Sequence, residues 1–338
     1  MVTLADVARR AGVSSSTVSY VLSGKRTISE ETRRRVERAV AELGYHPHAR
    51  ARALAARRSY ILALVVPLRV GGYEPVMMEV VTSVTVAARQ YGYDVLLITN
   101  DEGPEGLRRV AVSGLADGVV LMDGAPGDER VELLRDTQAV LIGVSGDPRG
   151  LSCVDHDFAA AGAVCADHLA DLGHAEVAFI ADAAAPHDRT LAGFRDRARE
   201  RGLRFVHRPC DRTYESTAGT FTRIMADRPG TTAFVVQNEG AIGPLLGLLR
   251  TSGRTVPEDA SVVALCPDRV AGRHTPRLTS VAGPTADLGR VAVELLVRRL
   301  TAAARGEEPV DELVLLDPVL TVRESTGPVD GMRFAVQT

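Results

Sequence analysis

The sequence predicts a small all-α head followed by a two-lobed α/β body with parallel sheets. Residues 1–60 hold twelve Lys or Arg and five Asp or Glu, whereas the whole chain has a net charge of −3, so the body is acidic. The hydrophobic pattern also changes near residue 60, from amphipathic helices to short apolar runs that alternate with helices. A basic head on an acidic body is typical of a nucleic-acid-binding module joined to a sensing domain.

The head begins with a short helix. Thr3 can accept a hydrogen bond from the first turn, with Asp6 as its capping-box partner, and Gly12 supplies the left-handed residue that ends such a helix. Four apolar residues at helical spacing form its buried face: Leu4, Val7, Ala8 and Ala11.

A second helix follows after a tight turn. Ser14 is a good N-cap, and we expect Val18, Val21 and Leu22 to face back onto the first helix. The residues turned outward are then Ser15, Ser16, Ser19 and Tyr20. In a helix-turn-helix, such residues near the N-terminal end of the second helix enter the major groove of DNA.

A third helix opens at Ser29 and closes at Gly44, with Val36, Val40 and Leu43 as its buried stripe. The segment 47–56 that follows is helix-prone but almost without an apolar face, so alone it should be frayed. Leu54 is its only large apolar residue.

The body begins with the continuous apolar run Ile61–Val66, which suits a strand covered on both faces. Helix-like and strand-like segments then alternate in two similar sets, and several of the helices end at glycine. This alternation predicts doubly wound α/β lobes, with a ligand crevice at the carboxyl ends of the strands. We expect the four cysteines, Cys153, Cys165, Cys210 and Cys266, to be buried reduced thiols, since no metal spacing links them.

The order of residues resembles the LacI/GalR family of bacterial transcriptional repressors. The resemblance covers nearly the whole chain and rests on these runs: Leu4–Ala8, Ala11–Ser14, Thr17–Ser19, Val21–Leu22, Ser29–Arg33, Glu42–Tyr45 with Pro47, and Val322–Thr326. It implies a helix-turn-helix head with a hinge helix at about 47–56, over residues 1–58, and a periplasmic-binding-protein-like body over 61–338. The implied lobes are about 61–157 with 284–316, and 158–283 with 317–338.

The resemblance and the helix pattern together suggest which residues contact DNA. Leu54 matches the hinge leucine that wedges between base pairs in the minor groove. Tyr20 stands where many members carry Arg, which places the operator preference at one base in doubt. We expect DNA contacts from Thr3, Ser14, Ser15, Ser16, Thr17, Ser19, Tyr20, Lys25, Arg26, Arg52 and Leu54.

The effector pocket implied by the family is present but altered. Cys266 and Pro267 stand where members commonly carry Asp, and Thr190 replaces the usual Arg, with Arg189 adjacent. The expected effector-binding residues are Tyr73, Glu74, Asp155, Arg189, Thr190, Tyr214, Asn238 and Cys266. A small polar metabolite is the expected ligand, with a sugar as one candidate. The alternative is that these residues are surface groups of the lobes and that the protein responds to no small molecule.

The sequence therefore predicts a DNA-binding transcriptional regulator, with repression as the expected mode, that binds a pseudo-palindromic operator as a homodimer. The alternative is a ligand-independent regulator whose body serves only dimerisation or partner docking. A sugar-handling enzyme or transport receptor would leave the basic head unexplained. We expect no enzymatic activity, no cofactor and no metal. Because no export signal or long apolar run is found, we expect a cytoplasmic location without membrane contact.

Overall fold

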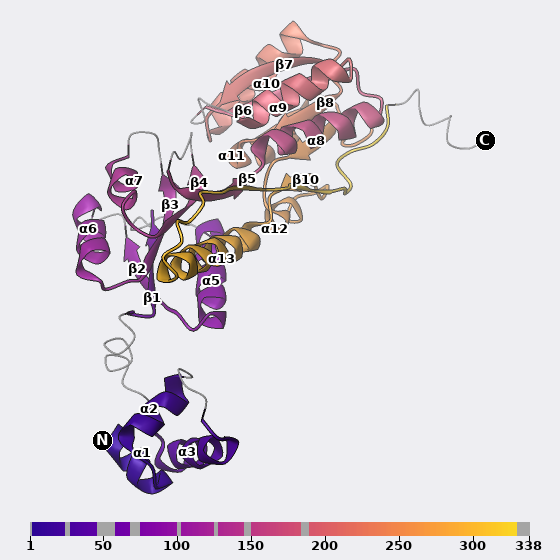
Figure 1. Ribbon diagram of the computed structural model, residues 1–338. Coiled ribbons are helices and arrows are strands. Elements are labelled where there is room, and N and C mark those ends of the chain that lie inside the picture. The colour runs from indigo at the N-terminus through magenta and orange to yellow at the C-terminus, as the bar shows by residue number, and fades with distance from the viewer. Residues whose placement is uncertain are drawn as a thin grey trace.

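The computed structural model describes residues 2–23, 28–45, 58–67, 75–99, 103–124, 128–144, 150–183 and 189–329. Figure 1 shows a helical head followed by two α/β units, with the head next to the first of them. The predicted hinge helix at about 47–56 lies outside the described residues and stays a prediction.

The head contains three helices, α1 (Leu4–Ala11), α2 (Ser15–Ser23) and α3 (Glu30–Leu43). The predicted caps are present. Thr3 and Asp6 form a reciprocal capping box on α1, and the Ser14 hydroxyl accepts the Thr17 N–H at 3.1 Å. Gly12 ends α1 with a φ of 63°, a conformation that glycine adopts without strain.

The buried core of the head is small. It consists of Val7, Ala8, Ala11, Val18, Val36, Ala39 and Tyr45. The prediction for Leu22 was wrong: its side chain is 39% exposed and does not belong to this cluster. Helical spacing predicts the face on which a residue lies, but burial also requires another element that packs against that part of the helix. Leu22 lies in the last turn of α2, which ends at Ser23.

The first α/β unit is built on a six-stranded sheet in the order β11-β5-β4-β3-β1-β2, all parallel. Its strands are β1 (Ile61–Val66), β2 (Asp94–Thr99), β3 (Gly118–Gly124), β4 (Ala139–Val144), β5 (Ser152–His156) and β11 (Leu313–Leu316). α5 (Pro75–Gln90) and α13 (Thr285–Ala304) pack side by side on one face (Figure 1). α6 (Gly103–Ser113) and α7 (Glu129–Leu134) contribute Leu107, Val110 and Leu134 to the core on the other.

The second unit repeats this plan in the order β12-β10-β9-β8-β6-β7. Its strands are β6 (Glu176–Asp182), β7 (Arg204–Cys210), β8 (Ala233–Val236), β9 (Ser261–Ala264), β10 (Thr279–Ala282) and β12 (Val319–Thr321). One face is covered by α8 (Phe158–Asp171) and α9 (Arg189–Glu200), the other by α10 (Tyr214–Asp227) and α11 (Glu239–Thr251), and α12 (Asp268–Ala271) is a single turn. All pairs are parallel except β10 with β12.

The chain passes between the two sheets three times. It leaves the first sheet after β5, returns after β10 to form α13 and β11, and leaves again to form β12. These three passages bring His156, Gly283 and Pro318 to the same place, where the carboxyl ends of β5 and β10 meet. A ligand crevice is expected at such a point.

The fold class predicted from the sequence, a helical head and a body of two mostly parallel α/β sheets, is confirmed. The prediction of buried thiols is also confirmed, since all four cysteines are buried and unpaired. Burial raises the pKa of Cys153, Cys165 and Cys266 to about 12 in each case. Across the parts of the chain that the structure covers, no helix is long and apolar enough to span a membrane.

Candidate functional site

The outward face of α2 is polar and accessible. Ser15, Ser16, Ser19 and Tyr20 are all exposed, whereas Val18 is fully buried in the core of the head. The buried valine turns one side of α2 towards the other two helices and leaves these four side chains in solvent. The face that the sequence predicted to enter the major groove is therefore presented to solvent.

Two predicted DNA-contacting hydroxyls belong to the helix caps. Thr3 donates to Asp6 Oδ2 at 2.6 Å and accepts the Asp6 N–H at 3.3 Å, and these bonds hold the pKa of Asp6 below its usual value. The Ser14 hydroxyl lies 2.8 Å from both the Ser16 and the Thr17 hydroxyl. As caps, these residues order the start of each helix before any contact with DNA. Each hydroxyl still has an acceptor lone pair. Four further predicted contacts lie outside the described residues: Lys25, Arg26, Arg52 and Leu54.

The second candidate site is a cavity of about 300 Å³ at the junction of the two sheets. It lies at the carboxyl ends of β5, β8, β9 and β10, as expected for a doubly wound fold. Its lining consists of Val76, His156, Asp157, Phe158, Ala161, Thr190, Gln237, Leu265, Cys266, Pro267, Val281, Ala282, Gly283, Thr285 and Pro318. We call this cavity the cleft.

The structure brings Asp155 and Arg189 together; neither lines the cleft, but their chain neighbours His156 and Thr190 do. Asp155, at the end of β5, is buried, and its Oδ2 accepts from Arg189 Nη2 at 2.6 Å. Arg189 is the first residue of α9 and lies over the Phe158 ring, 4.9 Å from its centroid. The ion pair therefore joins a strand of the first sheet to a helix of the second unit, and the half-exposed guanidinium retains N–H groups that a polar ligand could use.

The other predicted effector residues are placed differently. Thr190 and Cys266 are buried and line the cleft. The Asn238 amide donates to the Cys210 carbonyl at 2.7 Å and accepts the Gly240 N–H, so it caps α11. Tyr214, at the start of α10, is 58% exposed and is not part of the cleft lining. Tyr73 and Glu74 lie outside the described residues.

Sequence reasoning missed several cleft residues, of which His156, Phe158 and Gln237 carry the most chemistry. Burial lowers the pKa of His156, and its buried Nδ1 has no hydrogen-bond partner among the residues that the structure describes. Gln237 Oε1 accepts the Asp182 N–H at 3.0 Å. His156 and Phe158 follow Asp155 closely and Gln237 precedes Asn238, so strand ends could have indicated them. Pro318 lies directly after the predicted lobe boundary at residues 316 and 317, which could have indicated it in the same way.

Close packing of α8 against α9 positions Arg189. A Cβ on Gly162 would overlap the Thr190 carbonyl, and one on Gly193 would overlap the Ala159 carbonyl. The two helices can therefore approach this closely only with glycine at both positions. The start of α9, with Arg189 and Thr190, is thereby held against α8.

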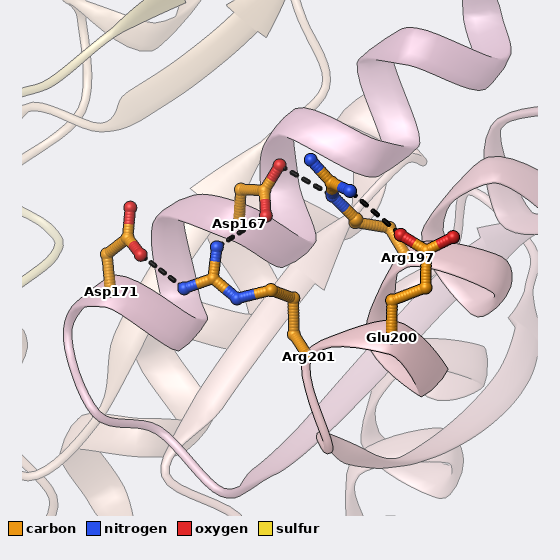
Figure 2. Close-up of polar contacts among 5 residues, drawn as sticks. All are labelled: Asp167, Asp171, Arg197, Glu200 and Arg201. Carbon is orange, nitrogen blue, oxygen red and sulfur yellow. Dashed lines mark hydrogen bonds and ion pairs between the residues drawn. The ribbon is translucent and has the colours of Figure 1, made fainter.

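Farther along, ion pairs link the same two helices (Figure 2). Asp167 of α8 accepts from Arg197 Nε at 2.8 Å and from Arg201 Nη1 at 2.7 Å. Arg201 also pairs with Asp171, and Arg197 with Glu200 at 2.8 Å. Because these groups are partly or largely exposed, we assign them a role in helix alignment and little net stability.

Comparison with known proteins identifies both parts of the chain. Residues 3–48 match the family model "Bacterial regulatory proteins, lacI family", and residues 166–326 match "Periplasmic binding protein-like domain". The HTH-type transcriptional regulator CelR of Thermobifida fusca is 33% identical over 96% of this chain and 98% of its own length. Catabolite control protein A of Staphylococcus xylosus is 27% identical over 92% of this chain and 94% of its own length.

Solved structures show the same arrangement. The complex of the transcriptional regulator CelR with cellobiose has a TM-score of 0.66 at 32% identity and covers 96% of this chain and 100% of that one. The lac repressor dimer bound to operator and the anti-inducer ONPF has a TM-score of 0.73 at 23% identity and covers 96% of this chain and 99% of that one. At 23% identity, the likeness to the lac repressor shows a shared fold.

Proposed function

Since the chain belongs to the lacI family of bacterial regulatory proteins, we propose that it is a transcriptional repressor whose α2 reads operator DNA and whose cleft binds a small polar ligand. The observation that carries the proposal is the presence, in one chain, of the exposed polar face of α2 and of a cleft bordered by the Asp155–Arg189 pair. The relatives are transcriptional regulators, which favours regulation over catalysis. Access to DNA requires a cytoplasmic location.

The DNA-binding part of the proposal rests on the head. The DNA contacts assigned to α2 come from short hydroxyl side chains and Tyr20, so direct base contacts would be few and phosphate contacts would contribute much of the affinity. One such module buries too little surface for useful specificity, and two modules on an inverted repeat are therefore expected.

Exposed apolar residues on the first unit support pairing with a second copy. Met78 and Val86 are about half exposed on α5, and Leu96 and Leu97 are exposed on the edge strand β2. An edge strand with apolar side chains would favour aggregation unless another chain covers it. We propose that the second subunit covers this surface, that the head comprises residues 1–58, and that the lobes are about 61–157 with 284–316 and 158–283 with 317–338.

The effector part of the proposal rests on the cleft. A sugar is the favoured class, because a CelR structure contains cellobiose and that protein is 32% identical to this chain. Asp155 and Arg189 come from opposite units, so a ligand that binds to this pair would change how the units close. Such a change would alter the spacing of the two hinge segments and hence the affinity for DNA.

A second candidate function, a ligand-independent regulator, is favoured by one observation. Cys266 and Pro267 make this wall of the cleft apolar, and Asn238 is used as a helix cap. Thermal unfolding of the full chain with a panel of mono- and disaccharides, cellobiose included, separates the two candidates. A rise in melting temperature with one sugar that also changes DNA affinity supports the effector proposal. No shift with any sugar of the panel supports the alternative.

A further inference from the structure

The orientation of α2 depends on the turn that joins it to α1. Among the described side chains of α2, Val18 is the one that is buried, while Thr17 and Val21 are half-buried. This leaves α2 with a small share of the head's core. A helix held by so few apolar contacts can rotate or slide unless its ends are fixed.

Arg35 of α3 lies against this turn. Its Nη2 donates to the Ala11 carbonyl at 2.6 Å and to the Gly12 carbonyl at 3.2 Å. The fit is close, because a Cβ on Gly12 would lie 2.8 Å from the same nitrogen. The contact therefore spans from the third helix to the end of the first, twenty-four residues earlier in the chain.

The chemistry of these two bonds is favourable. The last carbonyls of an α-helix have no partner within the helix, and the C-terminal end carries a partial negative charge. A guanidinium at that position satisfies both carbonyls and places a positive charge at the negative end of α1. The turn already contains the Gly12 and Val13 N–H bonds to Arg9 and Ala8, so its N–H groups and its carbonyls are both satisfied.

We propose that Arg35 is a positioning residue for DNA recognition: it clamps the α1–α2 turn and so sets the angle at which α2 meets the major groove, without itself touching DNA. The inference rests on the DNA-binding function of the head. It assigns to an arginine in a basic head a role different from the usual one, which is contact with a phosphate.

The two roles predict different dependence on salt. Loss of a phosphate contact lowers affinity for all sequences and reduces the slope of log affinity against log salt by about one. Loss of a clamp changes the geometry of α2, so it lowers affinity for the selected sequence and leaves the slope and the affinity for unselected DNA unchanged.

The test compares the full-length wild type with R35Q, R35K and the control R34Q. Arg34 is the neighbouring residue of α3, is largely exposed, and pairs with Glu30 at 3.4 Å, so R34Q removes the same charge without touching the turn. Each protein is titrated, over a range of salt, with the duplex that the wild type selects from a random pool and with an unselected duplex of equal length.

We expect R35Q to bind the selected duplex about tenfold more weakly, which corresponds to about 1.4 kcal/mol, with an unchanged salt slope and unchanged binding to the unselected duplex. R35K should recover part of the loss, since an ammonium can also donate to both carbonyls. A slope reduced by about one in R35Q, or equal effects of R35Q and R34Q on both duplexes, would overturn the proposal. If R35Q unfolds the head, R35K decides: specific binding at the wild-type slope supports the clamp, and its absence overturns it.

A measurement without DNA separates the clamp from the proposed function. Amide hydrogen exchange at Gly12 and Val13 reports on the turn itself. We expect exchange at these two amides to accelerate in R35Q and to stay at the wild-type rate in R34Q. Equal rates in both variants would contradict the clamp even if the wild type binds DNA as proposed. Faster exchange in a chain that selects no DNA would instead support the clamp and contradict the DNA-binding function.

Discussion

The Asp155–Arg189 pair is the residue-scale feature on which the effector proposal depends. We expect Asp155→Ala or Arg189→Ala to abolish the response to effector and to leave operator binding nearly unchanged, because both residues lie far from the head along the fold and beside the cleft. Each substitution removes one partner of an ion pair whose carboxylate is buried.

The measurement is operator affinity with and without the effector found by thermal shift. Arg195→Ala is the matched control, since Arg195 lies on the same helix, is half exposed and pairs with the neighbouring Asp196 at 3.4 Å. A normal response in both cleft variants would show that the pocket assignment is wrong.

A buried histidine gives a second residue-scale prediction. His174 lies 2.9 Å from the Thr232 hydroxyl through Nδ1 and 2.9 Å from the Ser261 hydroxyl through Nε2. Burial lowers its pKa from 6.5 to about 4. As the pH falls, the unfolded chain therefore binds this proton before the folded chain does. The contribution of neutral His174 to the free energy of unfolding is fully present above about pH 6.5, and about 3 kcal/mol is lost between pH 6.5 and 4.

Urea unfolding at several pH values measures this loss. His174→Gln should be less stable at pH 7 and should lose less stability on acidification than the wild type, because the amide does not titrate. The remaining pH dependence has the same sign, since burial also lowers the pKa of His156 and His168. An identical pH dependence in the variant and the wild type would contradict this assignment.

Leu54 carries a prediction that rests on the sequence, since it lies outside the described residues. An apolar wedge unstacks a base step at a cost of a few kcal/mol, which is offset by the contacts that a kinked duplex allows. Two such wedges should sit at the operator centre, most easily at a flexible pyrimidine–purine step such as CpG. Leu54→Ala should weaken operator binding strongly and reduce DNA bending, with dimerisation and effector binding unchanged. Wild-type bending and affinity in this variant would refute the wedge.

At the scale of elements, the crossing of α8 and α9 determines where Arg189 lies. Gly162→Ala would force the helices apart at Thr190, so we expect lower stability, by about 1–3 kcal/mol, and loss of the effector response. Gly219→Ala is the control: it lies in α10 with open space around its Cβ, and it should stabilise the protein slightly. Chemical unfolding and effector titration test both variants, and a Gly162→Ala protein that matches wild type would contradict the close-packing account.

The sequence predicts some elements better than others, for physical reasons. The capped helices of the head and the apolar run Ile61–Val66 were found because local chemistry decides them. β7 and β12 were not found, since Arg204–Cys210 and Val319–Thr321 are edge strands with exposed side chains and little periodicity. Their pairing depends on distant neighbours.

The same distinction applies to the cleft. Asp155 and Arg189 could be chosen in advance because the resemblance to the family marks their positions in the sequence. The sequence could not predict that Asn238 caps a helix or that Tyr214 is exposed, because tertiary packing determines which partner a side chain meets. Residue type and position therefore indicated the place of the cleft more reliably than its lining.

At the scale of the whole molecule, the central claim is that two copies of the chain read one inverted-repeat site. The body is required for this, since the exposed apolar surfaces of α5 and β2 belong to it. A head fragment of residues 1–59 should therefore bind weakly, and binding by the full chain should fall steeply with salt because phosphates supply much of the affinity.

The most direct measurement is the affinity and stoichiometry of the full chain on duplexes that carry the selected site intact or cut to one half-site. We expect two chains on the intact duplex, with an affinity far above that of the half-site and of the head fragment. One chain per duplex, or equal affinity of the full chain and the fragment for the intact site, would contradict the account.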